Sequence, residues 1–159
     1  MVFDSILVVC VGNICRSPLG ERLLEKKLLD RGLDITVASA GIAALEGHGA
    51  DEDAASVALA RNVSLDGHAA RQFSYEIGAA HALILVMEAG HKWEIVKTAP
   101  DLSGRIMLFD HWIGAAGIPD PYRRSIAFHE EVFTQVEKAA SAWVDKLQKS
   151  TQEKTKNAG

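Results

Sequence analysis

What is scarce in this sequence already excludes several classes of protein. It contains only two cysteines, Cys10 and Cys15, which are too few and too close together for the disulfide framework of a small secreted protein. The apolar run at residues 6–11 is too short to span a bilayer, and the residues before it carry no basic side chain of the kind that begins a secretory leader. We therefore expect a cytoplasmic protein with no membrane insertion.

Charge and histidine spacing restrict the function further. The formal net charge of −4 does not favour nucleic acid or an anionic membrane surface as a partner. The six histidines show no spacing typical of a metal site, so no metal or cofactor is expected. With 48% hydrophobic residues, the chain can form a core, and we expect one domain over residues 1–149. Residues 150–159 are polar and are expected to form a frayed or disordered tail.

Short apolar runs alternate with amphipathic helical patterns along the chain. Strands are predicted at residues 6–10, 35–38, 81–86 and 105–109, and helices at residues 18–31, 51–62, 88–98 and 125–149. Strands separated by helices favour an α/β fold with three α/β/α layers around a four-stranded parallel sheet. In such sheets ligands bind beyond the carboxyl ends of the strands, where the strand order reverses. Cys10 lies at one of these strand ends.

Residues 10–17, the 10–17 loop, carry most of the functional signal. Cys10 ends a predicted strand, and Arg16 follows after five residues, just before Ser17 and Pro18 begin a helix. Gly12 allows a tight turn, so the N–H groups of residues 11–17 can surround an anion beside the positive end of that helix. A guanidinium adds a two-pronged donor for phosphate oxygens, and the same positive groups favour a thiolate.

The residue types of the 10–17 loop suit phosphoryl transfer. A Cys10 thiolate that faces a bound phosphate can attack phosphorus and form a phosphocysteine intermediate. Ser17 can donate a hydrogen bond to that thiolate, and Asn13 can hold the loop through its amide and tolerates a left-handed backbone. The alternative is that both cysteines are small buried hydrophobes and Arg16 is a surface charge. A nucleotide P-loop needs a lysine that is missing here, and a thioredoxin site needs two residues between its cysteines, not four.

Residues 9–18, VCVGNICRSP, resemble the signature of low molecular weight protein tyrosine phosphatases, which implies that the 10–17 loop is the phosphatase P-loop. The resemblance runs from about Ser5 to about Leu147 and includes residues 39–41, 68–72 and 120–122. Residues 109–112 and 118–125 resemble the bacterial branch encoded with exopolysaccharide and capsule export. Members of that branch typically dephosphorylate the tyrosine-rich tail of a membrane tyrosine autokinase. The resemblance therefore implies a phosphotyrosine protein as substrate, no cofactor, and a chain that we expect to be a monomer.

The resemblance also implies roles for individual residues. Cys10 corresponds to the nucleophile, Arg16 to the phosphate clamp and Asp120 to the general acid that protonates the leaving phenolate. Without the rest of the pattern, Asp120 followed by proline would be read as the start of a turn. The remaining implied roles are phosphate binding by Val11, Gly12, Asn13, Ile14, Cys15 and Ser17, bracing of the loop by Asn13 and His68, and two pocket walls formed by Tyr122 and Leu45.

Several positions remain open at this stage. Cys15 is predicted either to form a reversible disulfide with Cys10 or only to pack. Gly20 stands where the family usually has alanine, and neither it nor the pair Arg123 and Arg124 has an assigned role, although the arginines can attract an acidic tail. An arsenate reductase on this scaffold needs later cysteines, and none follows Cys15. A phosphotyrosine-binding module without turnover would be favoured only if the nucleophile, clamp or acid were missing.

Overall fold

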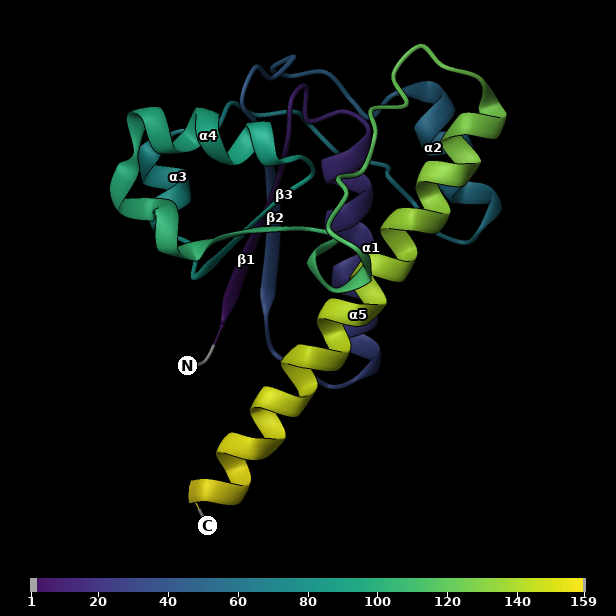
Figure 1. Cartoon of the computed structure of the whole chain (residues 1–159). Helices are drawn as coiled ribbons and strands as arrows, with labels where there is room; N and C mark the ends of the chain where they lie inside the picture. Colours follow the sequence, from purple (N-terminus) through teal and green to yellow (C-terminus); the bar gives the residue numbers. More distant parts are fainter. Residues whose placement is uncertain (1–2, 159) are drawn as a thin grey trace.

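A four-stranded parallel sheet lies at the centre of the molecule, as predicted (Figure 1). This computed structural model describes the backbone of residues 3–158 and the side chains of residues 3–153. The strand order is β2-β1-β3-β4. The strands are β1 (Ser5–Cys10), β2 (Thr36–Gly41), β3 (Leu83–Val86) and β4 (Ile106–Leu108).

Strand β1 is buried on both faces, which explains its unbroken apolar sequence. Its side chains alternate between two cores, with Ile6, Val8 and Cys10 in one and Leu7 and Val9 in the other. The first core lies between the sheet and helices α1 (Arg16–Asp30), α2 (Glu52–Ala60) and α5 (Ile126–Ala158). The second lies under α3 (Tyr75–Ala79), α4 (Ala89–Thr98) and the 3₁₀ segment η1 (Pro100–Arg105).

The strand order places the 10–17 loop where ligands bind in folds of this class. Strand β2 pairs with one side of β1, and β3 pairs with the other side. The connections that leave β1 and β3 therefore diverge at the carboxyl edge of the sheet and open a crevice there. Cys10 is the last residue of β1, so its side chain lies at this crevice.

Several helix boundaries are set by capping side chains. Asp51, predicted as a cap, accepts a hydrogen bond from the N–H of Ala54 at the start of α2. Ser125 does the same for α5 through the N–H of Phe128.

Helix α1 begins two residues earlier than predicted, at Arg16. The short helix α3 and the segments η1 and η2 (His111–Ile113) were not predicted, because they are too short to show a helical period.

The predicted disordered end of the chain is wrong for residues 150–158, because α5 continues through Ala158 (Figure 1). Residues 126–158 contain no glycine or proline, and the polar residues near the end are largely Gln, Glu and Lys, which are good helix formers. Polarity alone therefore misled the prediction. Within residues 3–158, no helix is both long enough and apolar enough to cross a bilayer.

The structure explains why glycine occupies position 20 in the middle of α1. A Cβ atom added to Gly20 would lie 3.0 Å from Phe109 Cε2, 3.1 Å from Val8 Cγ1 and 3.2 Å from Met87 Cε. All three of those side chains are fully buried. The missing Cβ therefore lets α1 approach the sheet and Phe109 closely, at the helix-propensity cost that glycine carries.

Candidate active site

The backbone of the 10–17 loop is fixed by hydrogen bonds from outside it. The N–H of Ile42, Ala43, Leu45 and Asp51 donate to the carbonyls of Cys10, Val11, Gly12 and Ile14, respectively, over 2.9–3.1 Å. The carbonyl of Asn13, which completes the run from Cys10 to Ile14, accepts from His68 Nε2 at 2.5 Å. No N–H from Val11 to Ser17 has an acceptor in the described part of the chain. The loop therefore presents a run of unused donors, which is the arrangement of an anion nest.

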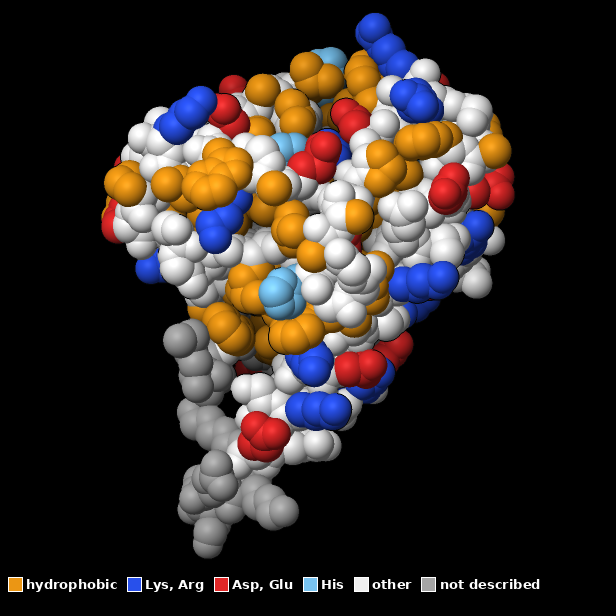
Figure 2. All heavy atoms as spheres, viewed as in Figure 1, with side chains coloured by type: hydrophobic (Ala, Val, Ile, Leu, Met, Phe, Trp, Pro, Cys, Tyr) orange, Lys and Arg blue, Asp and Glu red, His pale blue; other side chains and the backbone are white. Residues whose placement is uncertain are grey.

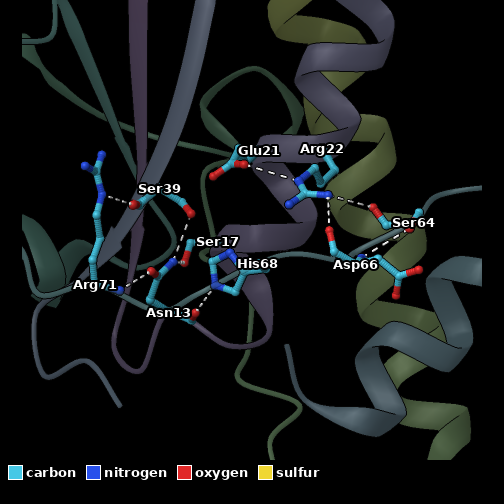
Figure 3. Close-up of polar contacts among 9 residues, drawn as sticks. All are labelled: Asn13, Ser17, Glu21, Arg22, Ser39, Ser64, Asp66, His68 and Arg71. Atoms are coloured by element: carbon cyan, nitrogen blue, oxygen red, sulfur yellow. Dashed lines mark hydrogen bonds and ion pairs between the residues drawn. The ribbon is translucent and has the colours of Figure 1, made fainter. Parts of the chain in front are cut away.

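Asn13 holds the loop in its conformation from within. Its backbone is left-handed, with φ of 58°, and its side chain is fully buried. The amide nitrogen donates to Ser17 Oγ at 2.7 Å and to Ser39 Oγ at 3.0 Å, and the amide oxygen accepts from the N–H of Arg71 at 2.9 Å (Figure 3). Asn13 therefore links the loop to β2 and to the segment after α2.

A second set of contacts holds the residues that support the loop. Arg22 of α1 donates to the carbonyls of Ser64 at 3.2 Å and Asp66 at 3.1 Å, just before His68 (Figure 3). Arg71 Nε donates to the carbonyl of Ser39 at 2.9 Å. These contacts fix the 64–71 segment against α1 and β2, so that His68 faces the loop.

Gly41, at the end of β2, permits the closest approach to the loop. A Cβ atom at this position would overlap the carbonyl oxygen of Val11 and would lie 3.0 Å from the nitrogen of Asn13. Any side chain here would therefore displace the loop. Sequence reasoning assigned no role to Gly41 or Arg71, because their contacts with the loop are made between distant segments.

The thiol of Cys10 lies at a pocket of about 180 Å³. Its Sγ atom is 2.8 Å from Ser17 Oγ, and the residue is only 3% exposed. The partly exposed side chains of Leu45 and Tyr122 lie at the rim of the pocket. On the face of the molecule drawn in Figure 2, acidic side chains lie among hydrophobic ones in the upper part. The full lining consists of Cys10, Val11, Gly12, Ile14, Cys15, Arg16, Ala43, Leu45, Asp120 and Tyr122. The structure thus brings the predicted nucleophile, clamp, acid and both predicted walls together in one pocket.

Arg16 is a buried cation, 2% exposed, held by one edge of its guanidinium. Its Nη1 donates to Glu88 Oε2 at 2.7 Å and to the carbonyl of Ile118 at 2.6 Å. Its Nη2 is 3.9 Å from Asp120 Oδ2, and neither Nη2 nor Nε has a hydrogen bond to any residue that the structure describes. The Nη2 and Nε groups on that edge can therefore donate to two oxygens of an anion.

Glu88, which sequence reasoning missed, positions Arg16 and also contacts a histidine. It follows β3 directly after Met87, and a polar residue just past a buried strand is the signal that could have indicated it. His91 Nε2 lies 3.3 Å from Glu88 Oε2, while His91 Nδ1 is buried and has no partner among the described residues. Burial and the nearby Arg16 charge lower the pKa of His91, which favours the neutral imidazole.

Asp120 and Cys15 differ in how far they are exposed. The Asp120 carboxylate is half exposed at the mouth of the pocket, and its Oδ1 accepts from the N–H of Tyr122 at 3.0 Å. Cys15 is buried, and burial together with the charges of Asp51 and Asp120 raises its pKa far above the ordinary value. Both Cys15 and Cys10 are free thiols, so a disulfide between them stays a prediction.

Comparison with known proteins identifies relatives over nearly the whole chain. The family model described as low molecular weight phosphotyrosine protein phosphatase matches residues 5–153. The Wzb phosphatase of Salmonella typhimurium is 48% identical over 92% of this chain and 95% of its own length. The Etp phosphatase of Escherichia coli is 46% identical over 91% and 95%, respectively.

Solved structures agree with these sequence relatives. The tyrosine phosphatase Wzb of Escherichia coli K30, determined with sulphate, has a TM-score of 0.88 and 44% identity and covers 92% of this chain and 99% of its own. Vibrio vulnificus Wzb, determined with benzylphosphonate, has a TM-score of 0.87 and 46% identity over 91% and 99%. The Wzb and Etp relatives confirm the predicted bacterial branch. The chain belongs to the low molecular weight phosphotyrosine protein phosphatase family.

Proposed function

We propose that this chain hydrolyses phosphotyrosine in proteins through a phosphocysteine intermediate on Cys10. The observation that carries the proposal is the 10–17 loop: its carbonyls from Cys10 to Ile14 all accept from residues outside it, while its N–H groups from Val11 to Ser17 have no acceptor among the described residues. A phosphate in this nest would also meet the free edge of Arg16. These donors are fixed before substrate arrives, so they can stabilise the charge of the transition state without reorganising.

The first step transfers the phosphoryl group to sulfur. The Cys10 thiolate attacks phosphorus, an S–P bond forms, and the bond between phosphorus and the phenolic oxygen breaks. Protonated Asp120 gives its proton to the departing phenolate, which leaves as tyrosine. The exposed carboxyl of Asp120 lies at the mouth of the pocket, where the leaving oxygen would be, and its contact with the N–H of Tyr122 orients it.

The second step releases inorganic phosphate. Asp120, now a carboxylate, takes a proton from water as the water oxygen attacks phosphorus and the S–P bond breaks. The electron pair of that bond returns to Cys10 as a thiolate. Ser17 donates a hydrogen bond to the sulfur and stabilises it as the leaving group, as its position at 2.8 Å allows.

Two side chains at the rim favour an aryl phosphate over an alkyl one. Tyr122 and Leu45 are both partly exposed and line the pocket above the buried thiol. An aromatic ring placed between them would bury apolar area and stack on Tyr122. Vibrio vulnificus Wzb, a relative at 46% identity, was determined with benzylphosphonate, an aromatic phosphonate that suits this interpretation.

The physiological substrate that we propose is the tyrosine-rich tail of a bacterial membrane tyrosine autokinase that acts in exopolysaccharide or capsule production. The proposal rests on the resemblance to the Wzb branch and on the cationic rim. Arg123 lies over the Tyr122 ring with its Cζ 5.1 Å from the centroid, and Arg124 lies over Phe128 at 4.5 Å. Two arginines on exposed positions beside the pocket would attract an acidic phosphopeptide.

The role of Asp120 is tested with leaving groups of different basicity. We expect Asp120→Ala to lower kcat for phenyl phosphate by about 10²–10³-fold, because a basic phenolate needs the proton, and to affect p-nitrophenyl phosphate much less. Asp34→Ala is the control, since Asp34 is exposed and precedes β2 at the opposite edge of the sheet. An equal loss with both substrates would contradict the role of Asp120 as the acid.

The substrate class is tested with a variant that binds but does not turn over. We expect Cys10→Ser to retain a tyrosine-rich peptide carrying one phosphotyrosine and to release the same peptide carrying phosphoserine. Calorimetry measures both affinities, and Arg123→Ala combined with Arg124→Ala should weaken the first of them. Equal affinity for the two peptides would contradict the aryl specificity.

A further inference from the structure

A second group of ionisable side chains lies outside the phosphate pocket. Asp51 and Asp53 at the start of α2 and His129 of α5 each offer one possible ligand atom, and these three atoms lie within 4.8 Å of one another. The His129 side chain is only 2% exposed. Its Nε2 atom is buried and has no hydrogen-bond partner in the described part of the chain. A buried imidazole nitrogen near the Asp51 carboxylate therefore lacks the hydrogen bond that its burial requires.

A direct contact between His129 and Asp51 does not supply that partner. Nε2 is 3.8 Å from Asp51 Oδ2, which is too long for a hydrogen bond. The same oxygen already accepts from the N–H of Ala54 at 3.1 Å. Asp53 is exposed and can rotate toward the buried nitrogen. A cation bound among the three groups would satisfy the nitrogen and neutralise both carboxylates at once.

We propose that Asp51, Asp53 and His129 bind a divalent transition-metal ion of the zinc class. One imidazole nitrogen and two carboxylate oxygens suit Zn²⁺, Co²⁺ or Ni²⁺, whereas Mg²⁺ and Ca²⁺ take only oxygen ligands. Three protein ligands leave the fourth position of a tetrahedral ion for water, on the side of the exposed Asp53. Histidine spacing did not indicate this site, because the ligands come from α2 and α5, which are distant in sequence.

The proposed site contains no residue that reacts with substrate, but one of its ligands, Asp51, also holds the 10–17 loop in place. The N–H of Asp51 donates to the carbonyl of Ile14 at 2.9 Å, which is one of the bonds that hold the 10–17 loop. His129 also borders a small cavity shared with Cys15 and Pro121, next to the nucleophile loop and the acid. An ion here would fasten the first turn of α2 to α5 and so fix Asp51 against the loop.

Metal binding to matched variants tests the proposal. Metal-free protein is titrated with ZnCl₂ in a calorimeter, and we expect one ion per chain. Asp53→Asn and His129→Phe should each weaken binding at least tenfold. Glu52→Gln is the control, because it removes the same charge from the same exposed turn of α2 without removing a ligand. His129→Phe should pack against the apolar walls of the cavity, Val132 and Phe133. If it does not fold, Asp53→Asn carries the comparison alone.

Cobalt distinguishes this site from the thiols. Co²⁺ bound to imidazole and carboxylates gives weak visible bands, whereas a thiolate ligand adds an intense sulfur-to-cobalt band in the near ultraviolet. We expect the visible bands, without the sulfur band, and their loss in Asp53→Asn. The proposal is overturned if wild type binds neither ion, if Asp53→Asn and Glu52→Gln bind alike, or if the only cobalt signal is the sulfur band.

Discussion

Cys10 Sγ lies 2.8 Å from Ser17 Oγ, and the same hydroxyl oxygen accepts a hydrogen bond from Asn13 Nδ2 at 2.7 Å. When Cys10 is a thiolate, the sulfur has no proton to give, so the hydroxyl of Ser17 donates to it. A chain of donors then runs from Asn13 through Ser17 to the sulfur and holds it at the end of β1.

Removing this hydroxyl should slow the release of phosphate from sulfur. We expect Ser17→Ala to lower kcat about tenfold to a hundredfold, because a hydrogen bond to a charged group contributes about 1.5–3 kcal/mol. Rapid mixing with p-nitrophenyl phosphate should reveal a burst of product, since the second step becomes the slower one. Ser17→Thr, which keeps the hydroxyl, is the control. A lower steady-state rate without any burst would place the effect in the first step instead.

Asn13 contributes amide hydrogen bonds and also adopts a left-handed backbone, and two variants can separate these two contributions. We expect Asn13→Ala to destabilise the fold by about 2–3 kcal/mol, because it loses the amide hydrogen bonds and forces alanine into a left-handed backbone. Asn13→Gly should recover part of this loss, since glycine adopts φ of 58° freely. Urea unfolding measures both. If the two variants were equally stable, backbone strain would not contribute.

His91 predicts a pH dependence of stability. Burial and the Arg16 charge lower its pKa in the folded protein, whereas the unfolded chain takes up a proton near pH 6.5. The unfolded state therefore binds more protons as pH falls below that value, and the fold loses stability by at most about 1.4 kcal/mol per pH unit. We expect wild type to lose more stability between pH 7.5 and 5.5 than His91→Gln does, as measured by urea unfolding. Equal losses would show that His91 does not contribute.

Replacing Gly20 with alanine should not give the gain in stability that usually follows when a glycine within a helix is replaced. We expect Gly20→Ala to destabilise the protein by about 1 kcal/mol, because the new Cβ would press on Phe109, Val8 and Met87. Gly90 of α4 is the matched control, since a Cβ there meets nothing within 4 Å and Gly90→Ala should stabilise. Adding Phe109→Leu to Gly20→Ala should cost less than the sum of the two changes. Strict additivity would mean that the methyl group does not press on Phe109.

Local sequence was sufficient to predict the strands, the longer helices and the 10–17 loop. The strands β1 and β3 are continuous apolar runs, and the caps Asp51 and Ser125 act on neighbouring N–H groups, so short windows of sequence determine them. Residues 150–158 show the limit of this reasoning, because their polarity suggested disorder although their helix propensity supports α5.

A thiol and a guanidinium share one loop at the end of a buried strand, and this much follows from the order of the residues, because five intervening residues fix their spacing. What holds the two groups there follows only from how the chain folds. Glu88, just after β3, accepts a hydrogen bond from Arg16. Gly41 at the end of β2 leaves room for the loop because it has no Cβ atom. His129 of α5 lies near Asp51 at the start of α2. Contacts of this kind depend on how separate elements pack, and packing leaves no periodic pattern in any one segment of the chain.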